Sequence, residues 1–274
     1  MAFITACTIL AGSAVAQKLS AEEIIAKHLE SIGKSDDRSK MLNVTAVGMV
    51  NYTHLSSASA PSGGKVVFAS EGNKALLAMT FQSSGYQGET FKFDGKDDFI
   101  GFSSPGRHSL LGDYLYKYKV ILKHNLLGGV LQKGWPFVEF ASRNVKVSSE
   151  GIKKIDGRDA YVLSYEPKKG SDIRIKVYFD KETYRHIRTE YLRTNQPGMG
   201  HDPNSSSSLV ETHENLTEDF SEFKTEYGVT LPRKYKIMLY SEGNGRTYEG
   251  TYTMVFTDFY YNSKLDASTF DPSK

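Results

Sequence analysis

The residues between Leu111 and Phe137 include most of the chain's candidates for a chemical role, and that role is contact with apolar groups. Leu111, Tyr114 and Leu115 begin a series at steps of three and four, which places side chains on one face of a helix. Such a face can cover an apolar ligand, because burial of alkyl surface is favourable by about 25 cal/mol per Å². The predicted ligand-binding residues are Leu111, Tyr114, Leu115, Tyr118, Leu122, Leu126, Val130, Trp135 and Phe137.

The same face has a simpler explanation, which is that it fills the core of the protein around it. Trp135 and Phe137 either line the mouth of a cavity or anchor the helix. We expect two helical pieces, split near His124 or at the adjacent glycines Gly128 and Gly129, which form a hinge or only end a helix. The sequence leaves open whether the segment fills a core or covers a cavity.

The sequence lacks the motifs of common catalytic sites. It has no His-Glu-x-x-His, no Gly-x-Ser-x-Gly, no phosphate-binding loop and no dinucleotide fingerprint. Its seven histidines have no metal-ligand spacing. We therefore predict no catalytic residue, no metal and no cofactor, so the chain is not expected to be an enzyme. A hydrolase whose paired acids meet across strands is the alternative that this search leaves open.

The charge balance argues against a nucleic-acid partner. The formal net charge is only +2, the sequence pI is about 8.3, and no basic run is interleaved with aromatic residues. The 17 Tyr and 15 Phe stand against a single Trp, which suits many half-buried strands.

The N-terminus resembles a secretory signal peptide, predicted to span residues 1–16. Its short apolar run ends in Ala14-Val15-Ala16, a small-x-small cleavage pattern, and is shorter than the roughly 20 residues that cross a bilayer as a helix. Cys7, the only cysteine, is either removed with this segment or lipidated. A mature chain without cysteine suits a bacterial envelope, so we predict export to the periplasm or cell envelope.

The remaining residues, 17–274, are predicted to form a single domain that is mainly β. Ser20 and Glu23 form a capping box for an N-terminal helix that ends at Gly33, and a polar linker is expected at Lys34–Lys40. About a dozen strand-like segments with turn residues between them follow, from Leu42 to Tyr261. We expect one large antiparallel sheet, curled into an incomplete β-barrel, whose concave face is covered by the N-terminal helix and the midchain helical insert.

The order of these parts resembles the LolA-like periplasmic lipoprotein-sorting proteins, and most closely their exported bacterial members. The resemblance is carried by the stretches Lys27–Gly33, Phe93–Lys96, Leu126–Trp135, Gly228–Pro232 and Phe259–Phe270. It implies helices that close the open side of an incomplete barrel, and an apolar cavity for acyl chains. The expected function is a non-enzymatic carrier of lipid or lipoprotein acyl chains, served by a membrane-associated donor or acceptor protein. The alternative is a structural or interaction module with a filled core and no ligand.

Overall fold

The computed structural model describes residues 19–54, 62–83, 85–143, 145–167, 171–195, 212–243 and 246–273. The predicted signal peptide at 1–16, Cys7, and the Ser-rich loop with His201 lie outside the described residues. Within the described residues, no helix has both the length and the apolar character needed to cross a bilayer.

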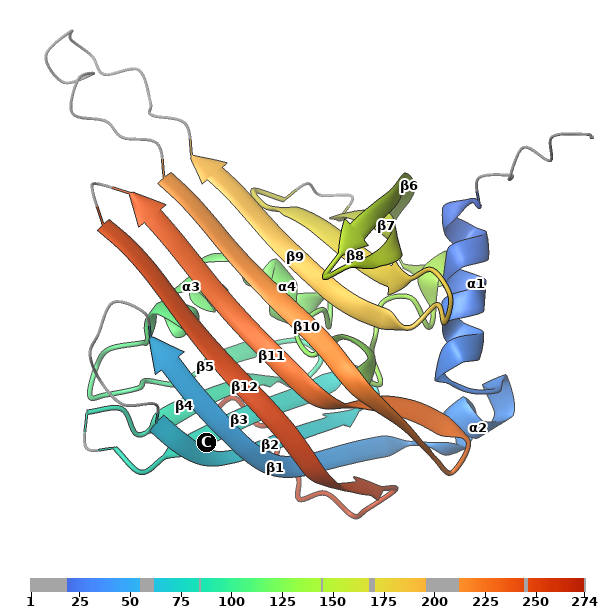
Figure 1. The fold of residues 1–274 in the computed structure, drawn as a ribbon. Coiled ribbons are helices and arrows are strands. Elements are labelled where there is room, and N and C mark those ends of the chain that lie inside the picture. The colour runs from blue at the N-terminus through green and yellow to red at the C-terminus, as the bar shows by residue number, and fades with distance from the viewer. Residues whose placement is uncertain are drawn as a thin grey trace, which may run out of the picture.

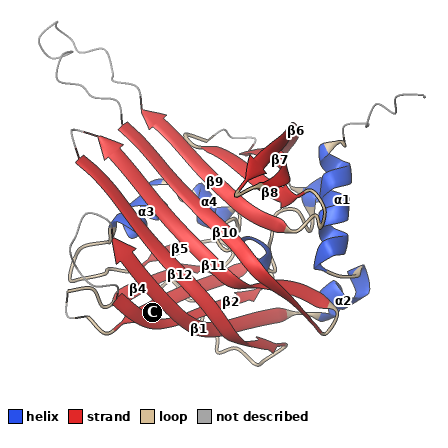
Figure 2. Cartoon of the chain, in the orientation of Figure 1, coloured by secondary structure: helices blue, strands red, loops and turns tan. Residues whose placement is uncertain are grey.

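One twelve-stranded antiparallel sheet forms the body of the protein (Figure 2), which confirms the predicted fold class. Its spatial order is β5-β4-β3-β2-β1-β12-β11-β10-β9-β8-β7-β6, so the first and last strands of the chain pair in its interior. The strands are β1 (Asn43–His54), β2 (Ser62–Glu71), β3 (Lys74–Phe81), β4 (Gly88–Phe93), β5 (Asp98–Ile100), β6 (Val145–Ile155), β7 (Arg158–Pro167), β8 (Arg174–Asp180), β9 (His186–Asn195), β10 (Thr212–Glu226), β11 (Val229–Gly243) and β12 (Arg246–Tyr261).

The N-terminal helix forms as the sequence predicts. In α1 (Ala21–Ile32), Ser20 accepts a hydrogen bond from the Glu23 backbone while the Glu23 side chain accepts one from Ser20 N, at 2.8 Å. Its buried face includes Ile24, Ile25 and His28. The predicted linker at Lys34–Lys40 is wrong, because Ser35–Lys40 forms a second helix, α2. Its acidic first turn and basic last turn fit the helix dipole, whereas the lack of an apolar face hid it from a periodicity search.

The helical insert joins β5 to β6, which are the two opposite edges of the sheet. It contains α3 (Leu110–Lys117), α4 (Val120–Lys123) and two short 3₁₀ turns, η1 (Gly129–Leu131) and η2 (Phe140–Ser142). The chain breaks at His124, as expected, and also earlier, at Tyr118 and Lys119. Figure 1 shows α3 and α4 inside the curve of the sheet, behind β9–β12, and α1 beside β6–β8.

The core is formed by the inner face of the sheet, the insert and α1 together. On β8, Ile175, Val177 and Phe179 face this core, as their alternation predicts. Tyr178 points to the other face but is also buried, in a small second cluster with Ala160 and Val162. The outer face of the sheet is therefore not wholly solvated.

The backbone at Gly128 brings the insert against β2. Gly128 has φ +86°, and a Cβ added there would lie 2.6 Å from Cζ of Phe68, which is buried. Gly106 also has a positive φ, +71°, but a Cβ there would meet nothing within 4 Å. Substitution at these two glycines can therefore separate the cost of backbone strain from the cost of a steric clash.

We expect Gly128→Ala to destabilise the protein by about 2–4 kcal/mol, since it adds an overpacking clash to left-handed strain. Gly106→Ala should cost about 1 kcal/mol, because it adds the strain alone. Urea unfolding of both variants measures the difference. Equal losses would show that the insert does not pack tightly on β2.

Candidate functional site

The structure buries all nine predicted ligand-binding residues in one apolar core with the sheet. Their exposed fractions run from 0% for Leu111, Leu115, Leu126, Trp135 and Phe137 to 6% for Val130. All nine side chains therefore meet in the same core. The side chains contact the sheet itself, so the insert fills the concave side in this structure.

Two of the nine residues also make polar contacts with the sheet. The Tyr114 hydroxyl donates to the backbone carbonyl of Tyr191 at 3.1 Å. The Tyr118 hydroxyl donates to the Glu214 carboxylate at 2.6 Å, which also accepts from Lys117 Nζ at 2.7 Å. These directional bonds fix the position of α3 on β9 and β10.

A buried carboxylate on β10 holds the middle of the insert. Glu218 is fully buried, and its Oε1 accepts hydrogen bonds from the Gly128 backbone N–H, at 2.6 Å, and from the Tyr235 hydroxyl. Its Oε2 accepts from the Tyr191 hydroxyl at 2.6 Å. Burial raises the pKa of Glu218 to about 7, against the opposing effect of these hydrogen bonds.

Two buried histidines lie around Trp135. His28 Nε2 accepts from Trp135 Nε1 at 3.1 Å, and its Nδ1 lies 3.0 Å from the Tyr184 carbonyl, which assigns the proton to Nδ1. Burial lowers the pKa of His28 to about 3 and that of His186 well below its usual value. The His186 ring stacks on Trp135 with centroids 4.7 Å apart. Both rings are thus neutral parts of the core.

A pocket of about 510 Å³ opens at the end of the insert, where α1 and α2 meet the β2–β3 turn. Its apolar wall includes two of the predicted ligand-binding residues, whereas the other seven line neither this pocket nor the one beside β12 described below. The apolar lining residues are Ile32, Met41, Val130, Trp135 and Val138.

Three cationic side chains also line this pocket, which we call the basic pocket. Arg38 Nε donates to the Gly33 carbonyl at 3.0 Å, Lys133 Nζ to the Arg38 carbonyl at 3.0 Å, and Arg143 to the Gly134 carbonyl at 2.6 Å. Burial lowers the pKa of both Arg38 and Lys133, and for Lys133 the charge of Arg38 adds to this effect. No carboxylate in the described part of the chain forms an ion pair with any of the three.

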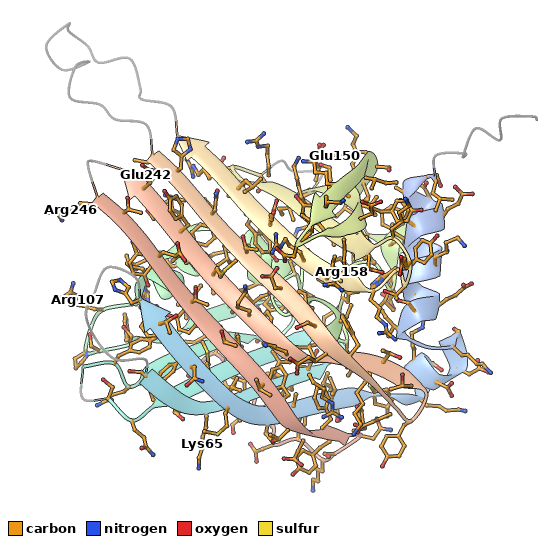
Figure 3. The ribbon with its side chains drawn as sticks, in the orientation of Figure 1. Lys65, Arg107, Glu150, Arg158, Glu242 and Arg246 are labelled. Atoms are coloured by element: carbon orange, nitrogen blue, oxygen red, sulfur yellow. The ribbon has the colours of Figure 1, made fainter. Side chains whose placement is uncertain are left out.

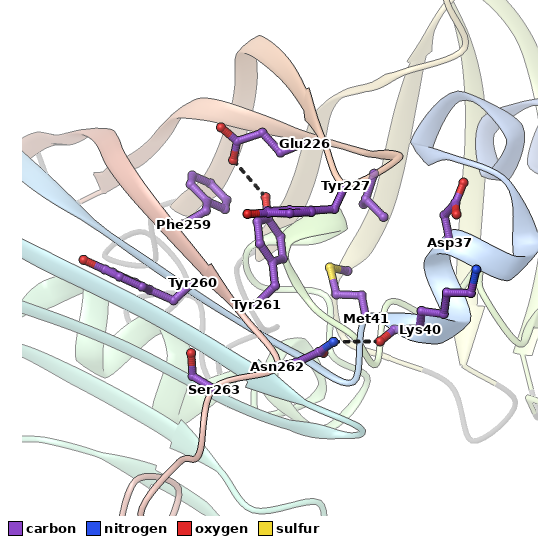
Figure 4. Close-up of a pocket in the computed structure, with 11 residues that line it drawn as sticks. Asp37, Lys40, Met41, Glu226, Tyr227, Phe259, Tyr260, Tyr261, Asn262 and Ser263 are labelled. Atoms are coloured by element: carbon purple, nitrogen blue, oxygen red, sulfur yellow. Dashed lines mark hydrogen bonds between the residues drawn. The ribbon is translucent and has the colours of Figure 1, made fainter.

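A second pocket, of about 520 Å³, lies where α2 faces the end of β12 (Figure 4). Tyr227 and Tyr260 present exposed rings beside it, with exposed fractions of 85% and 52%. The close-up shows the Tyr261 hydroxyl directed at Glu226 and the Asn262 amide at the α2 backbone.

Two carboxylates line this second pocket, Asp37 and Glu226, and the second of them is already paired. Glu226 binds Arg233 at 2.6 Å and Lys224 at 2.9 Å. The pocket therefore offers aromatic faces, one neutralised acid and one further carboxylate. The basic pocket, whose cations have no acidic partner among the residues that the structure describes, is the stronger candidate for a ligand site.

Two of the five apolar residues of the basic pocket, Val130 and Trp135, were predicted from the sequence, whereas its cations were not. Arg38 lies in α2, whereas Lys133 and Arg143 lie in the insert, and all three look like ordinary solvated charges among 34 Lys and Arg. No spacing connects them. Within the described residues, no group of three or more His, Cys, Asp or Glu is placed to hold a metal ion.

Comparison with known proteins finds similar structures but no similar sequences. No family model matches the chain, and no curated protein matches it. The chain is similar to a LolA superfamily protein from Nitrosomonas europaea, with 15% identity and a TM-score of 0.49 over 92% of this chain and 97% of that one. An outer membrane lipoprotein-sorting protein domain from Vibrio parahaemolyticus has 13% identity and a TM-score of 0.46, over 91% of this chain and 98% of that domain.

A protein of the DUF1329 family from Desulfovibrio piger is also similar, with 12% identity and a TM-score of 0.43 over 91% of this chain and 96% of that one. The superfamily that the sequence resembles is thus represented among these structures.

The buried carboxylate of Glu218 generates a pH prediction. Its folded-state pKa of about 7 lies above the ordinary value of 4.5, so the folded protein retains a proton that the unfolded chain releases. The stabilisation is complete below pH 4.5 and is lost as the pH rises through 7. Relative to Glu218→Gln, the wild type should lose about 3 kcal/mol across this range.

Chemical denaturation of both proteins from pH 4 to 9 measures this difference. Subtraction of the two curves removes the contribution of His28 and His186, which lower the stability of both proteins on acidification because they are neutral in the core. A pH-independent difference would contradict the role given to Glu218.

Proposed function

We propose that this chain is a non-enzymatic binding protein for acyl chains in the bacterial envelope, and that the acyl chain enters at the basic pocket. One observation carries the proposal: Val130 and Trp135 belong to the buried face of the insert and also line an open pocket. The pocket therefore borders the apolar core that the insert fills.

The size and lining of the basic pocket suit an alkyl chain. Its volume of about 510 Å³ lies within the range of pockets that bind small molecules. Burial of each methylene contributes about 0.8 kcal/mol, so an apolar wall is sufficient for binding and no catalytic group is needed. The envelope location rests on the predicted signal peptide, and a donor or acceptor protein at the membrane is part of the proposal.

A longer acyl chain would require the insert to move. Gly128 and Gly129 both have positive φ and lie between α4 and the end of the insert, so they are suited to act as a hinge. The bond between Gly128 N–H and Glu218 would have to break in that movement. In this proposal, the structure shows the insert in the closed position, in which it covers the concave face of the sheet.

The second candidate is a structural or interaction module that binds no lipid. The near-complete burial of all nine predicted residues favours it, since the concave face is already filled. The two candidates differ in whether the basic pocket takes up an alkyl chain.

A charge placed on the pocket wall distinguishes them. Val138 lines the basic pocket and is 39% exposed, whereas Ile152 on β6 is 48% exposed and lines neither pocket described above. We expect Val138→Asp to weaken binding of monoolein, a neutral acyl lipid, at least tenfold. Ile152→Asp should leave it unchanged, and both should alter the unfolding free energy by about 0.5 kcal/mol or less.

Emission of Trp135, the only tryptophan, reports binding, and native mass spectrometry checks the stoichiometry. If the wild-type protein binds no monoolein by either method, the acyl-binding function is refuted and the structural or interaction module remains. Equal losses in both variants would place the acyl chain elsewhere on the protein.

A further inference from the structure

The cations of the basic pocket outnumber the acids around it. Arg38, Lys133 and Arg143 line it together with one carboxylate, Glu139, which is exposed and forms no ion pair in the described part of the chain. Elsewhere on the surface most buried or half-buried cations are paired, as Arg188 is with Asp219 at 2.6 Å. The pocket is therefore a local region of positive potential.

The three cations are held in place and still have donors to spare. Each contributes one N–H to a backbone carbonyl of its own neighbourhood. A guanidinium has five N–H donors and an ammonium has three, so most of their hydrogen-bonding capacity is unused by the protein. A planar carboxylate or a phosphate accepts several such bonds at once.

The backbone around the cations is also fixed. Lys133 N donates to the buried Ser70 hydroxyl of β2 at 2.9 Å, and Asn125 reaches the Asn73 carbonyl in the β2–β3 turn at 2.9 Å. A Cβ at Gly134 would lie 3.0 Å from the Gly72 carbonyl, so the insert approaches this turn closely. The donors are consequently placed by packed structure.

The apolar and cationic parts of the pocket are adjacent. Ile32, Met41 and Val138 lie in the same 510 Å³ pocket as the three cations. An apolar wall beside unpaired donors matches a ligand with an alkyl chain and an anionic end. A purely apolar ligand would leave the cations half-buried and without a negatively charged partner, which is unfavourable.

We propose that the basic pocket selects anionic amphiphiles, with a carboxylate or phosphate head group bound by Arg38, Lys133 and Arg143 and the alkyl chain along the apolar wall. This inference rests on the proposed function, since it names the class of acyl compound that the same pocket takes. It adds a preference for negative charge that acyl binding alone does not impose.

The test compares dodecanoate, dodecyl phosphate, uncharged dodecanol and inorganic phosphate by calorimetry, all below micelle-forming concentrations. We expect the wild type to bind the two anionic amphiphiles at least tenfold more tightly than dodecanol. This preference should weaken as salt is raised, because charge pairs at a partly exposed site are screened.

Three variants, Lys133→Met, Arg38→Gln and Arg143→Gln, should each reduce the preference for the anions over dodecanol to threefold or less. Lys65→Met and Arg246→Gln are matched controls, since both side chains are exposed and line neither pocket. Lys65 lies on β2 and Arg246 at the start of β12 (Figure 3). Circular dichroism of each variant checks its fold, and the salt dependence of the wild type tests the charge preference without any substitution.

The outcomes separate the two proposals. Equal affinity for dodecanoate and dodecanol would overturn the anion selectivity and leave the acyl-binding function standing. If none of the three dodecyl compounds binds, the proposed function fails. If inorganic phosphate binds as tightly as dodecyl phosphate, the ligand is not an amphiphile, because the alkyl chain then contributes nothing to the affinity.

Discussion

The helical insert joins strands at opposite edges of one open sheet, and much of the structure depends on this constraint. β5 and β6 each pair on one side only, so the chain between them has to cross from edge to edge. The sheet curls, and the insert crosses on its concave side, where its apolar face completes the core. Lysines along the edge strand β6, at 146, 153 and 154, oppose further strand pairing there.

Polar groups inside this core give the insert a defined position. Apolar packing by itself is not directional, whereas Glu218 accepts from the Gly128 backbone and His28 accepts from Trp135. Each group would be costly to bury without these partners. Separate hydrogen bonds therefore hold the middle of the insert to β10 and its end to α1.

A filled concave face and a ligand pocket coexist because they occupy different parts of the insert. Its leucines from 111 to 126 pack on the sheet, while Val130 and Trp135 lie where the insert reaches α1 and α2. The cations gather at this junction because the end of the insert meets α2 there. Among the described residues they have no acidic partner, which distinguishes this pocket from the one beside β12, whose Glu226 is neutralised by Arg233 and Lys224.

The sequence by itself determined the local elements and the face that each would bury. Alternation and turn residues predicted the strands, and the capping box predicted α1, because these signals depend on neighbours within a few residues. The spacing from Leu111 onwards predicted the buried face of the insert but could not decide between a core and a cavity. The polar helix α2 was missed, since it has no apolar periodicity.

Only the tertiary structure decided what the insert covers and which charges meet at its end. Strand order placed β5 and β6 at opposite edges, and the crossing that follows brought Arg38 beside Lys133 and Arg143. Residues about a hundred positions apart are brought together by the path of the whole chain, and no local preference encodes that path.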